Sequence, residues 1–115
     1  MHRINVSYIE EVCGKDKEII TEMVNIFREQ MPELAGEMWE LYRNKDYFNL
    51  GLIAHKAKSS VAIMGMEDMA IKLKDLELKA KAGEDEDLYE GYIKEFVSQG
   101  KEAVSELDDY LAELD

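Results

Sequence analysis

His55 is the residue of this sequence whose type and surroundings best suit group-transfer chemistry. It lies in residues 49–65, where apolar side chains recur at helical spacing and predict a helix. At about 100° per residue, the most apolar stripe falls opposite His55, so we expect the imidazole to point outward. The stripe expected to face the core contains Leu50, Ile53, Ala57, Ser60 and Met64.

Small residues are expected around His55 on the outward face of this helix. An isolated surface histidine usually carries no chemistry, but these neighbours are unusual. A face built for helix stability would carry Glu, Lys, Arg or Gln, and a mid-helix glycine costs about 1 kcal/mol relative to alanine. The pattern therefore favours close approach of a partner. The expected surface neighbours are Gly51, Ser59, Ala62 and, at the margin, Met66.

A neutral imidazole nitrogen is a competent nucleophile toward phosphorus near pH 7. Phosphoryl transfer also needs in-line access and positive charge near the phosphoryl oxygens. Lys58, one turn after His55 on the same side, is the strongest candidate for that charge. Ser59 is either a hydroxyl donor to the phosphate or simply a small residue that gives clearance.

Other residues of this helix are better suited to contact a partner than a phosphate. Lys56 lies about 100° from the histidine, and Leu52 lies about 60° away on its other side. Residues 50–66 carry two lysines and no acidic residue. A locally basic patch in an acidic protein suits docking onto an acidic pocket. Metal binding is disfavoured, because His55 has no second His or Cys one turn away.

The spacing around the histidine forms a motif: Lys58 follows three residues after it, Ser59 four and Gly65 ten. This segment resembles the signature of histidine-containing phosphotransfer (HPt) domains. Residues 27–34, with the pattern Phe-x-x-x-Met-Pro-x-Leu, and residues 76–84, with Leu-Glu followed by Ala-Lys-Ala-Gly-Glu, resemble further parts of the family. Two positions depart from its common pattern: Ala57, where Leu is usual, and Ser59, where Gly is frequent.

The resemblance implies a carrier that takes a phosphoryl group from an aspartyl phosphate on a receiver domain and passes it to another receiver. The implied partners are response-regulator receiver domains and a hybrid sensor histidine kinase. No cofactor is expected on this chain, and magnesium is expected on the receiver. No Gly-rich nucleotide loop is present, so we expect no autonomous ATP-dependent kinase activity. The alternative is a helical adaptor that binds a receiver-like partner without chemistry.

Glu77 is the candidate partner of the histidine. If the chain turns back near residues 62–67, His55 lies roughly ten residues before the turn and Glu77 roughly twelve after it, which places them at similar height on antiparallel helices. The family often has Glu or Gln at this position. The resemblance therefore implies that Glu77 accepts a hydrogen bond from the other imidazole nitrogen and fixes its tautomer. An ordinary surface glutamate is the alternative.

Composition limits the remaining possibilities. The 115 residues, 46% of them hydrophobic, suit one domain spanning residues 1–115. The net charge of −12 argues against nucleic acid and anionic membrane surfaces as partners. A single cysteine, Cys13, excludes an intrachain disulfide and favours a reducing compartment, so we expect a cytoplasmic protein.

Apolar spacing predicts an all-α protein. A short first helix is expected from a cap at Asn5 or Ser7 to about Val12, and Pro32 is expected to kink the second helix without ending it. Four long amphipathic segments with short connections predict an antiparallel up-and-down four-helix bundle, with the short helix across one end. The long segments span residues 16–44, 46–64, 67–82 and 87–114.

Overall fold

The computed structural model describes residues 3–114, and every regular element in this range is helical. The prediction of an all-helical fold is therefore confirmed, and its boundaries agree closely with those expected. No helix in this range has the length and apolarity needed to cross a membrane. The elements are α1 (Val6–Cys13), α2 (Lys17–Arg43), α3 (Tyr47–Ile63), α4 (Glu67–Ala82), the 3₁₀ turn η1 (Glu86–Leu88) and α5 (Tyr89–Glu113).

Short polar side chains start the first three helices. Asn5 accepts a hydrogen bond from the backbone N–H of Tyr8, so Asn5 rather than Ser7 is the cap of α1. Asp16 caps α2 and Asp46 caps α3 in the same way. Such caps satisfy backbone donors that have no partner within the helix.

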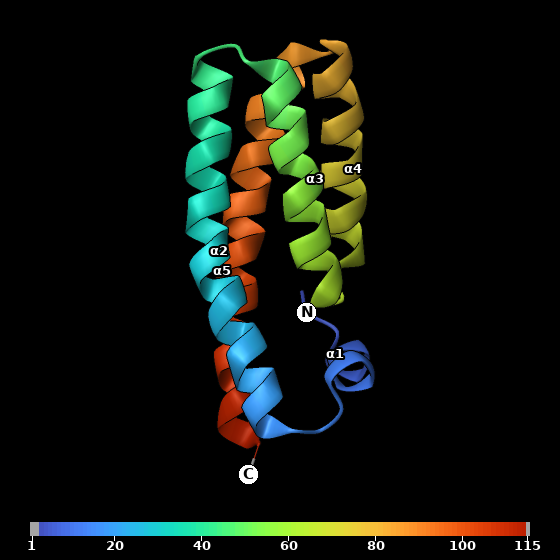
Figure 1. The fold of residues 1–115 in the computed structure, drawn as a ribbon, viewed down its shortest axis with the longest axis vertical. Helices are drawn as coiled ribbons and strands as arrows, with labels where there is room; N and C mark the ends of the chain where they lie inside the picture. Colours follow the sequence, from blue (N-terminus) through green and yellow to red (C-terminus); the bar gives the residue numbers. More distant parts are fainter. Residues whose placement is uncertain (1–2, 115) are drawn as a thin grey trace.

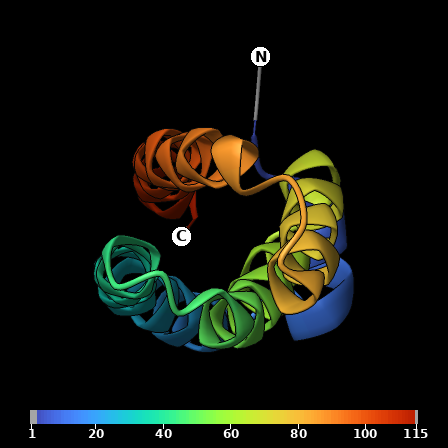
Figure 2. The same ribbon diagram turned by 90° about the horizontal axis from the view of Figure 1, so that it is seen from above.

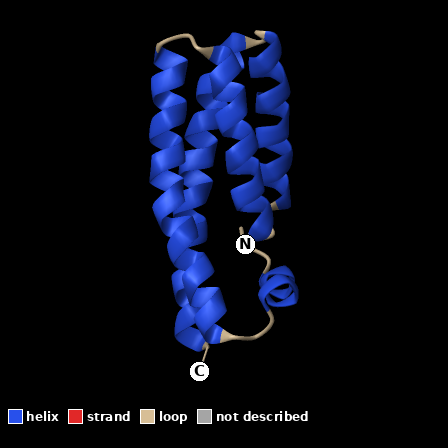
Figure 3. Ribbon diagram, in the orientation of Figure 1, coloured by secondary structure: helices blue, strands red, loops and turns tan. Residues whose placement is uncertain are grey.

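The four long helices lie side by side, and Figure 2 shows them arranged around a common interior. α3 packs most extensively on α4, and α2 packs on both α5 and α3. α2 and α5 extend past the ends of α3 and α4, where α1 lies crosswise (Figures 1 and 3). α2 continues through Pro32 to Arg43. Buried apolar side chains from all of these helices form one core, and the largest include Phe27, Met38, Leu73, Tyr89 and Phe96.

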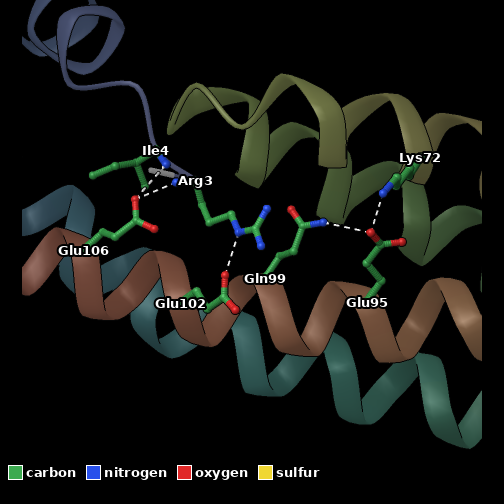
Figure 4. A network of polar contacts seen from close by, with 7 residues as sticks. All are labelled: Arg3, Ile4, Lys72, Glu95, Gln99, Glu102 and Glu106. Atoms are coloured by element: carbon green, nitrogen blue, oxygen red, sulfur yellow. Dashed lines mark hydrogen bonds and ion pairs between the residues drawn. The ribbon is translucent and has the colours of Figure 1, made fainter. Parts of the chain in front are cut away.

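A polar network ties the N-terminal segment to α5 (Figure 4). The backbone N–H of Arg3 donates to Glu106 Oε1 at 2.6 Å, and the N–H of Ile4 donates to the same oxygen at 3.2 Å. The Arg3 guanidinium also donates from Nε to Glu102 Oε2 at 2.6 Å. These contacts hold the chain before α1 against the last helix.

The network continues from α5 to α4. Gln99, which is 9% exposed, donates from Nε2 to Glu95 Oε1 at 3.0 Å. Lys72 of α4 pairs with the same carboxylate oxygen. The Glu95 carboxylate therefore serves two donors and joins the two helices.

Candidate functional site

His55 and Glu77 meet across the contact between α3 and α4. Imidazole Nδ1 lies 3.1 Å from both carboxylate oxygens of Glu77. The two side chains differ greatly in exposure: His55 is 53% exposed and Glu77 is 6% exposed. One edge of the ring is thus held against the protein while the rest faces solvent. The sequence-based prediction that Glu77 lies beside His55 is confirmed, and the alternative of an ordinary surface glutamate is wrong.

The ionisation of Glu77 decides which imidazole nitrogen carries the proton. Burial alone would raise the pKa of this carboxyl. Hydrogen bonds from Lys81 and His55, together with charge interactions with His55 and Lys74, outweigh burial and lower the pKa to about 2. A carboxylate has no hydrogen to donate, so Nδ1 must be the donor in this contact. In the neutral ring the lone pair is then on Nε2. Within residues 3–114, no side chain or backbone group bonds Nε2.

Two lysines of α4 flank Glu77. Lys81 Nζ lies 2.9 Å from Glu77 Oε2, and Lys74 Nζ lies 3.9 Å from Oε1. Neither lysine was predicted from the sequence to be part of the site. The signal was present for Lys81, because a glutamate followed by a lysine four residues later is a favourable pair on one helix face.

Lys58 and Lys56 remain available to an incoming group. Lys58 is half-buried and Lys56 is exposed on α3. Neither lysine pairs with a carboxylate in the part of the chain that the structure describes. The exposed Ser59 hydroxyl donates to the backbone carbonyl of His55 at 3.4 Å, so it already sits beside the histidine. Leu52, 42% exposed, and the exposed Ala62 complete the accessible surface of this helix.

The expected surface position of Gly51 is wrong. Gly51 is buried beneath α4. A Cβ at this position would lie 2.7 Å from Lys81 Cγ and 2.9 Å from the backbone oxygen of Glu77. The missing side chain allows α3 and α4 to approach each other, so the close partner of Gly51 is another helix of the same chain.

Met66 is also misplaced in the sequence-based surface. It is 3% exposed and follows the end of α3, where it begins α4 as its N-cap residue. The helical wheel fails here because the helix has already ended, so its side chain no longer follows the direction of the α3 face. Met66 belongs to the core.

The expected core stripe of α3 is only partly correct. Leu50, Ala57 and Met64 are buried as predicted, but Ile53 and Ser60 are only half-buried. The buried arc turns instead toward α4 and takes in Ala54 and Val61, which are fully covered. α3 packs against helices on two flanks, and a single stripe opposite the histidine does not describe such a helix.

No group of three or more His, Cys, Asp or Glu side chains in residues 3–114 is arranged to hold a metal ion. Comparisons of this chain with known protein families, with curated proteins and with solved structures found no match. The assignment of a function therefore rests on the residues around His55 and on their geometry.

Proposed function

We propose that this protein is a histidine phosphotransfer protein of a multistep two-component phosphorelay. In this proposal the four long helices form the antiparallel up-and-down bundle of an HPt domain, and α1 is the short extra N-terminal helix. The observation that carries the proposal is the contact between His55 Nδ1 and the ionised Glu77, which leaves Nε2 as an exposed nucleophile. The resemblance of residues 54–65 to the HPt signature supports the same function.

The transfer step follows from this tautomer. The Nε2 lone pair attacks the phosphorus of an aspartyl phosphate on a receiver domain, and the bond from phosphorus to the aspartyl oxygen breaks. The aspartate leaves as a carboxylate, and N-phosphohistidine forms. The positive charge that develops on the ring stays close to Glu77, because Nδ1–H remains bonded to its carboxylate. A second receiver aspartate reverses the reaction.

Lys58 and the receiver's magnesium supply the remaining charge in this proposal. Phosphoryl transfer is accelerated mainly by positioning and by positive charge near the phosphoryl oxygens. Lys58 is one turn from the nucleophile and has no carboxylate partner among residues 3–114, so its ammonium is free to meet those oxygens.

The surface around His55 suits an acidic receiver pocket. The chain has a net charge of −12, yet Lys56 and Lys58 on α3 and Lys74 and Lys81 on α4 surround the histidine. Such local charge steers an acidic partner toward the nucleophile. The exposed side chains of Leu52 and Ala62 offer small apolar contacts beside it. We place this carrier in the cytosol with its receivers and its hybrid sensor kinase.

The test is transfer from phosphorylated receiver domains to the purified protein. The proposal expects an acid-labile, alkali-stable phosphate on the chain and loss of phosphate from the receiver. Receiver binding that leaves no phosphate on the chain would instead favour the non-catalytic adaptor. A parallel incubation with ATP and magnesium alone is expected to give no labelling, because the phosphoryl donor in this proposal is a receiver.

A further inference from the structure

Lys81 occupies an unusual position behind the histidine and its carboxylate. Its Nζ donates to Glu77 Oε2 at 2.9 Å, and the same oxygen lies 3.1 Å from His55 Nδ1. Lys81, Glu77 and His55 thus form a continuous chain from α4 to the exposed ring. Only the last member of this chain, His55, presents a nucleophile to solvent.

Gly51 makes room for this lysine. A Cβ on Gly51 would lie 2.7 Å from Lys81 Cγ and 3.2 Å from the Lys81 backbone nitrogen. The aliphatic stem of Lys81 therefore passes over Gly51 on its way to Glu77. Its side chain is 33% exposed, against 49% for Lys74, whose Nζ is 3.9 Å from Glu77. Lys81 is both the closer and the better-enclosed of the two cations.

We infer that Lys81 is a positioning residue for phosphoryl transfer, which fixes the Glu77 carboxylate and through it the Nδ1–H tautomer of His55. This inference rests on the proposed function of His55. Lys81 does not touch the phosphoryl group in this scheme, so its role is distinct from that of Lys58. Gly51 is part of the same device, because it provides the space in which the lysine stem lies.

Charge balance gives the reason for such a residue. Three charged or titratable side chains face the Glu77 carboxylate within the described residues: His55 from α3, and Lys74 and Lys81 from α4. A buried carboxylate without a close cation tends to take up a proton. A protonated Glu77 would be able to donate to Nδ1, which would place the ring proton on Nε2 and remove the nucleophile. Lys81 opposes this by holding the carboxylate in its charged form.

The test compares Lys81→Met, Lys81→Arg and Lys79→Met. Methionine keeps most of the aliphatic stem and removes the charge, whereas arginine keeps a cation that can reach the carboxylate. Lys79 is the matched control, because it pairs with Asp75 four residues away on the same helix, at 3.0 Å, and does not contact Glu77. Three quantities are measured: the ring nitrogen shifts of His55 by ¹⁵N NMR, the carboxyl titration of Glu77 by ¹³C NMR, and the single-turnover transfer rate.

We expect Lys81→Met to raise the midpoint of the Glu77 titration above its value of about 2 and to reduce the Nδ1–H tautomer. Transfer should slow about tenfold, the lower end of what removing a group behind a functional histidine costs. Lys81→Arg should restore both NMR signatures, and Lys79→Met should leave all three quantities unchanged.

Unchanged NMR signatures in Lys81→Met would overturn the inference, as would equal effects in Lys81→Met and Lys79→Met. The proposed function can fail separately. If the wild-type protein accepted no phosphate while Lys81→Met still altered the Glu77 titration and the His55 tautomer, the positioning by Lys81 would stand and the phosphotransfer function would fall.

Discussion

The site around His55 and the polar network of Figure 4 are both built around a glutamate that accepts hydrogen bonds from two other residues. In the network, Glu95 takes two donors, Gln99 and Lys72, and thereby joins α4 to α5. In the site, Glu77 also takes donors from two residues at close range, Lys81 and His55. The carboxylates are alike in this respect, and both lie between helices.

The two sites differ in whether a donor side chain keeps another nitrogen that does not bond the carboxylate. The side-chain nitrogens of Lys72 and Gln99 both donate to Glu95, and these bonds stabilise the packing of α4 on α5. His55 gives Glu77 one nitrogen and keeps the other on its 53% exposed ring. The two carboxylates also differ in burial, because the side chain of Glu95 is 36% exposed and that of Glu77 is 6% exposed. The phosphotransfer proposal rests on the imidazole nitrogen that His55 keeps free of Glu77.

The largest effect is expected from His55→Gln. The side chain of His55 is 53% exposed, and substitutions at exposed positions usually change stability by no more than about 0.5 kcal/mol. We therefore expect little change in the stability of this variant. Loss of the nucleophile should abolish phosphate uptake completely. Phosphate incorporation and thermal melting are measured on the same variant. If the variant were still labelled, the phosphate acceptor would be a residue other than His55.

Glu77→Leu and Glu95→Leu test whether the two carboxylates differ in their effect on phosphoryl transfer. Removing the acceptor behind His55 should slow transfer by about 10- to 100-fold. It should also lower stability, because removing one partner of an ion pair leaves Lys81 without its carboxylate. Glu95→Leu should also lower Tm, because it breaks the α4–α5 link to Lys72, but it should leave transfer unchanged. Transfer rates and melting curves of both variants are compared. Equal losses of transfer in the two variants would contradict the claim that Glu77, and not Glu95, acts on phosphoryl transfer.

Glu77→Leu is also expected to change how the stability of the protein depends on acid pH. The pKa of Glu77 is lowered from 4.5 to about 2 in the folded protein, so its contribution is present above about pH 4.5 and is lost as the pH falls through about 2. The full contribution is on the order of 3 kcal/mol. Glu77→Leu should therefore show a shallower loss of stability between these pH values than the wild type, as followed by urea unfolding.

Lys58→Ala should remove the charge that faces the phosphoryl group. A charge-assisted contact contributes roughly 1.5–3 kcal/mol, so we expect slower transfer or a less stable phosphohistidine, with little change in Tm. Lys56→Ala, on the same helix, is the control for general loss of positive charge. Equal rates for Lys58→Ala and the wild type would leave Lys58 as a solvated surface residue.

Ser59→Arg and Ser59→Gly test whether the low profile beside His55 matters. Electrostatic attraction to an acidic receiver predicts equal or faster transfer for arginine. Steric reasoning predicts slower transfer, because the reacting atoms must approach to about 3–3.5 Å in line. We expect arginine to be slow and glycine to be close to wild type. Transfer as fast with arginine as with serine would contradict the close-approach interpretation.

The smallest effects are expected from glycine substitutions, and they concern stability. Gly51→Ala places a Cβ 2.9 Å from the backbone oxygen of Glu77, which cannot move freely, so overpacking should cost about 1–3 kcal/mol. Gly36→Ala in α2 has nothing within 4 Å of its new Cβ and should gain roughly 0.5–1 kcal/mol from helix propensity. Opposite signs in urea unfolding are the expected result.

Much of the fold was predictable because its signals are local. Caps such as Asp16 and Asp46, and stops such as Gly65 and Gly83, act within a few residues of the chain, so the helix boundaries follow from spacing and turn chemistry. The pairing of His55 with Glu77 was also predictable, because an antiparallel return fixes height to within about a turn.

The errors arose where neighbouring helices decide burial. Gly51 and Met66 were assigned to the surface from one helical wheel, whereas α4 covers the first and the turn after α3 buries the second. A wheel contains no information on which flank a second helix will cover. The spacing of Glu77 and Lys81 indicated that the two could pair, but the role proposed for Lys81 also depends on the space above Gly51, which exists only once α3 and α4 have packed.

The most direct measurement is to identify the nitrogen that carries phosphate. The protein, labelled with ¹⁵N in its histidines, is phosphorylated by a receiver and examined by ³¹P and ¹⁵N NMR under alkaline conditions. Because Glu77 holds Nδ1–H, the phosphoryl group is expected on Nε2 of His55. Phosphate on Nδ1 of His55, or phosphate on any other residue, would contradict the role assigned to Glu77 and with it the account of this site.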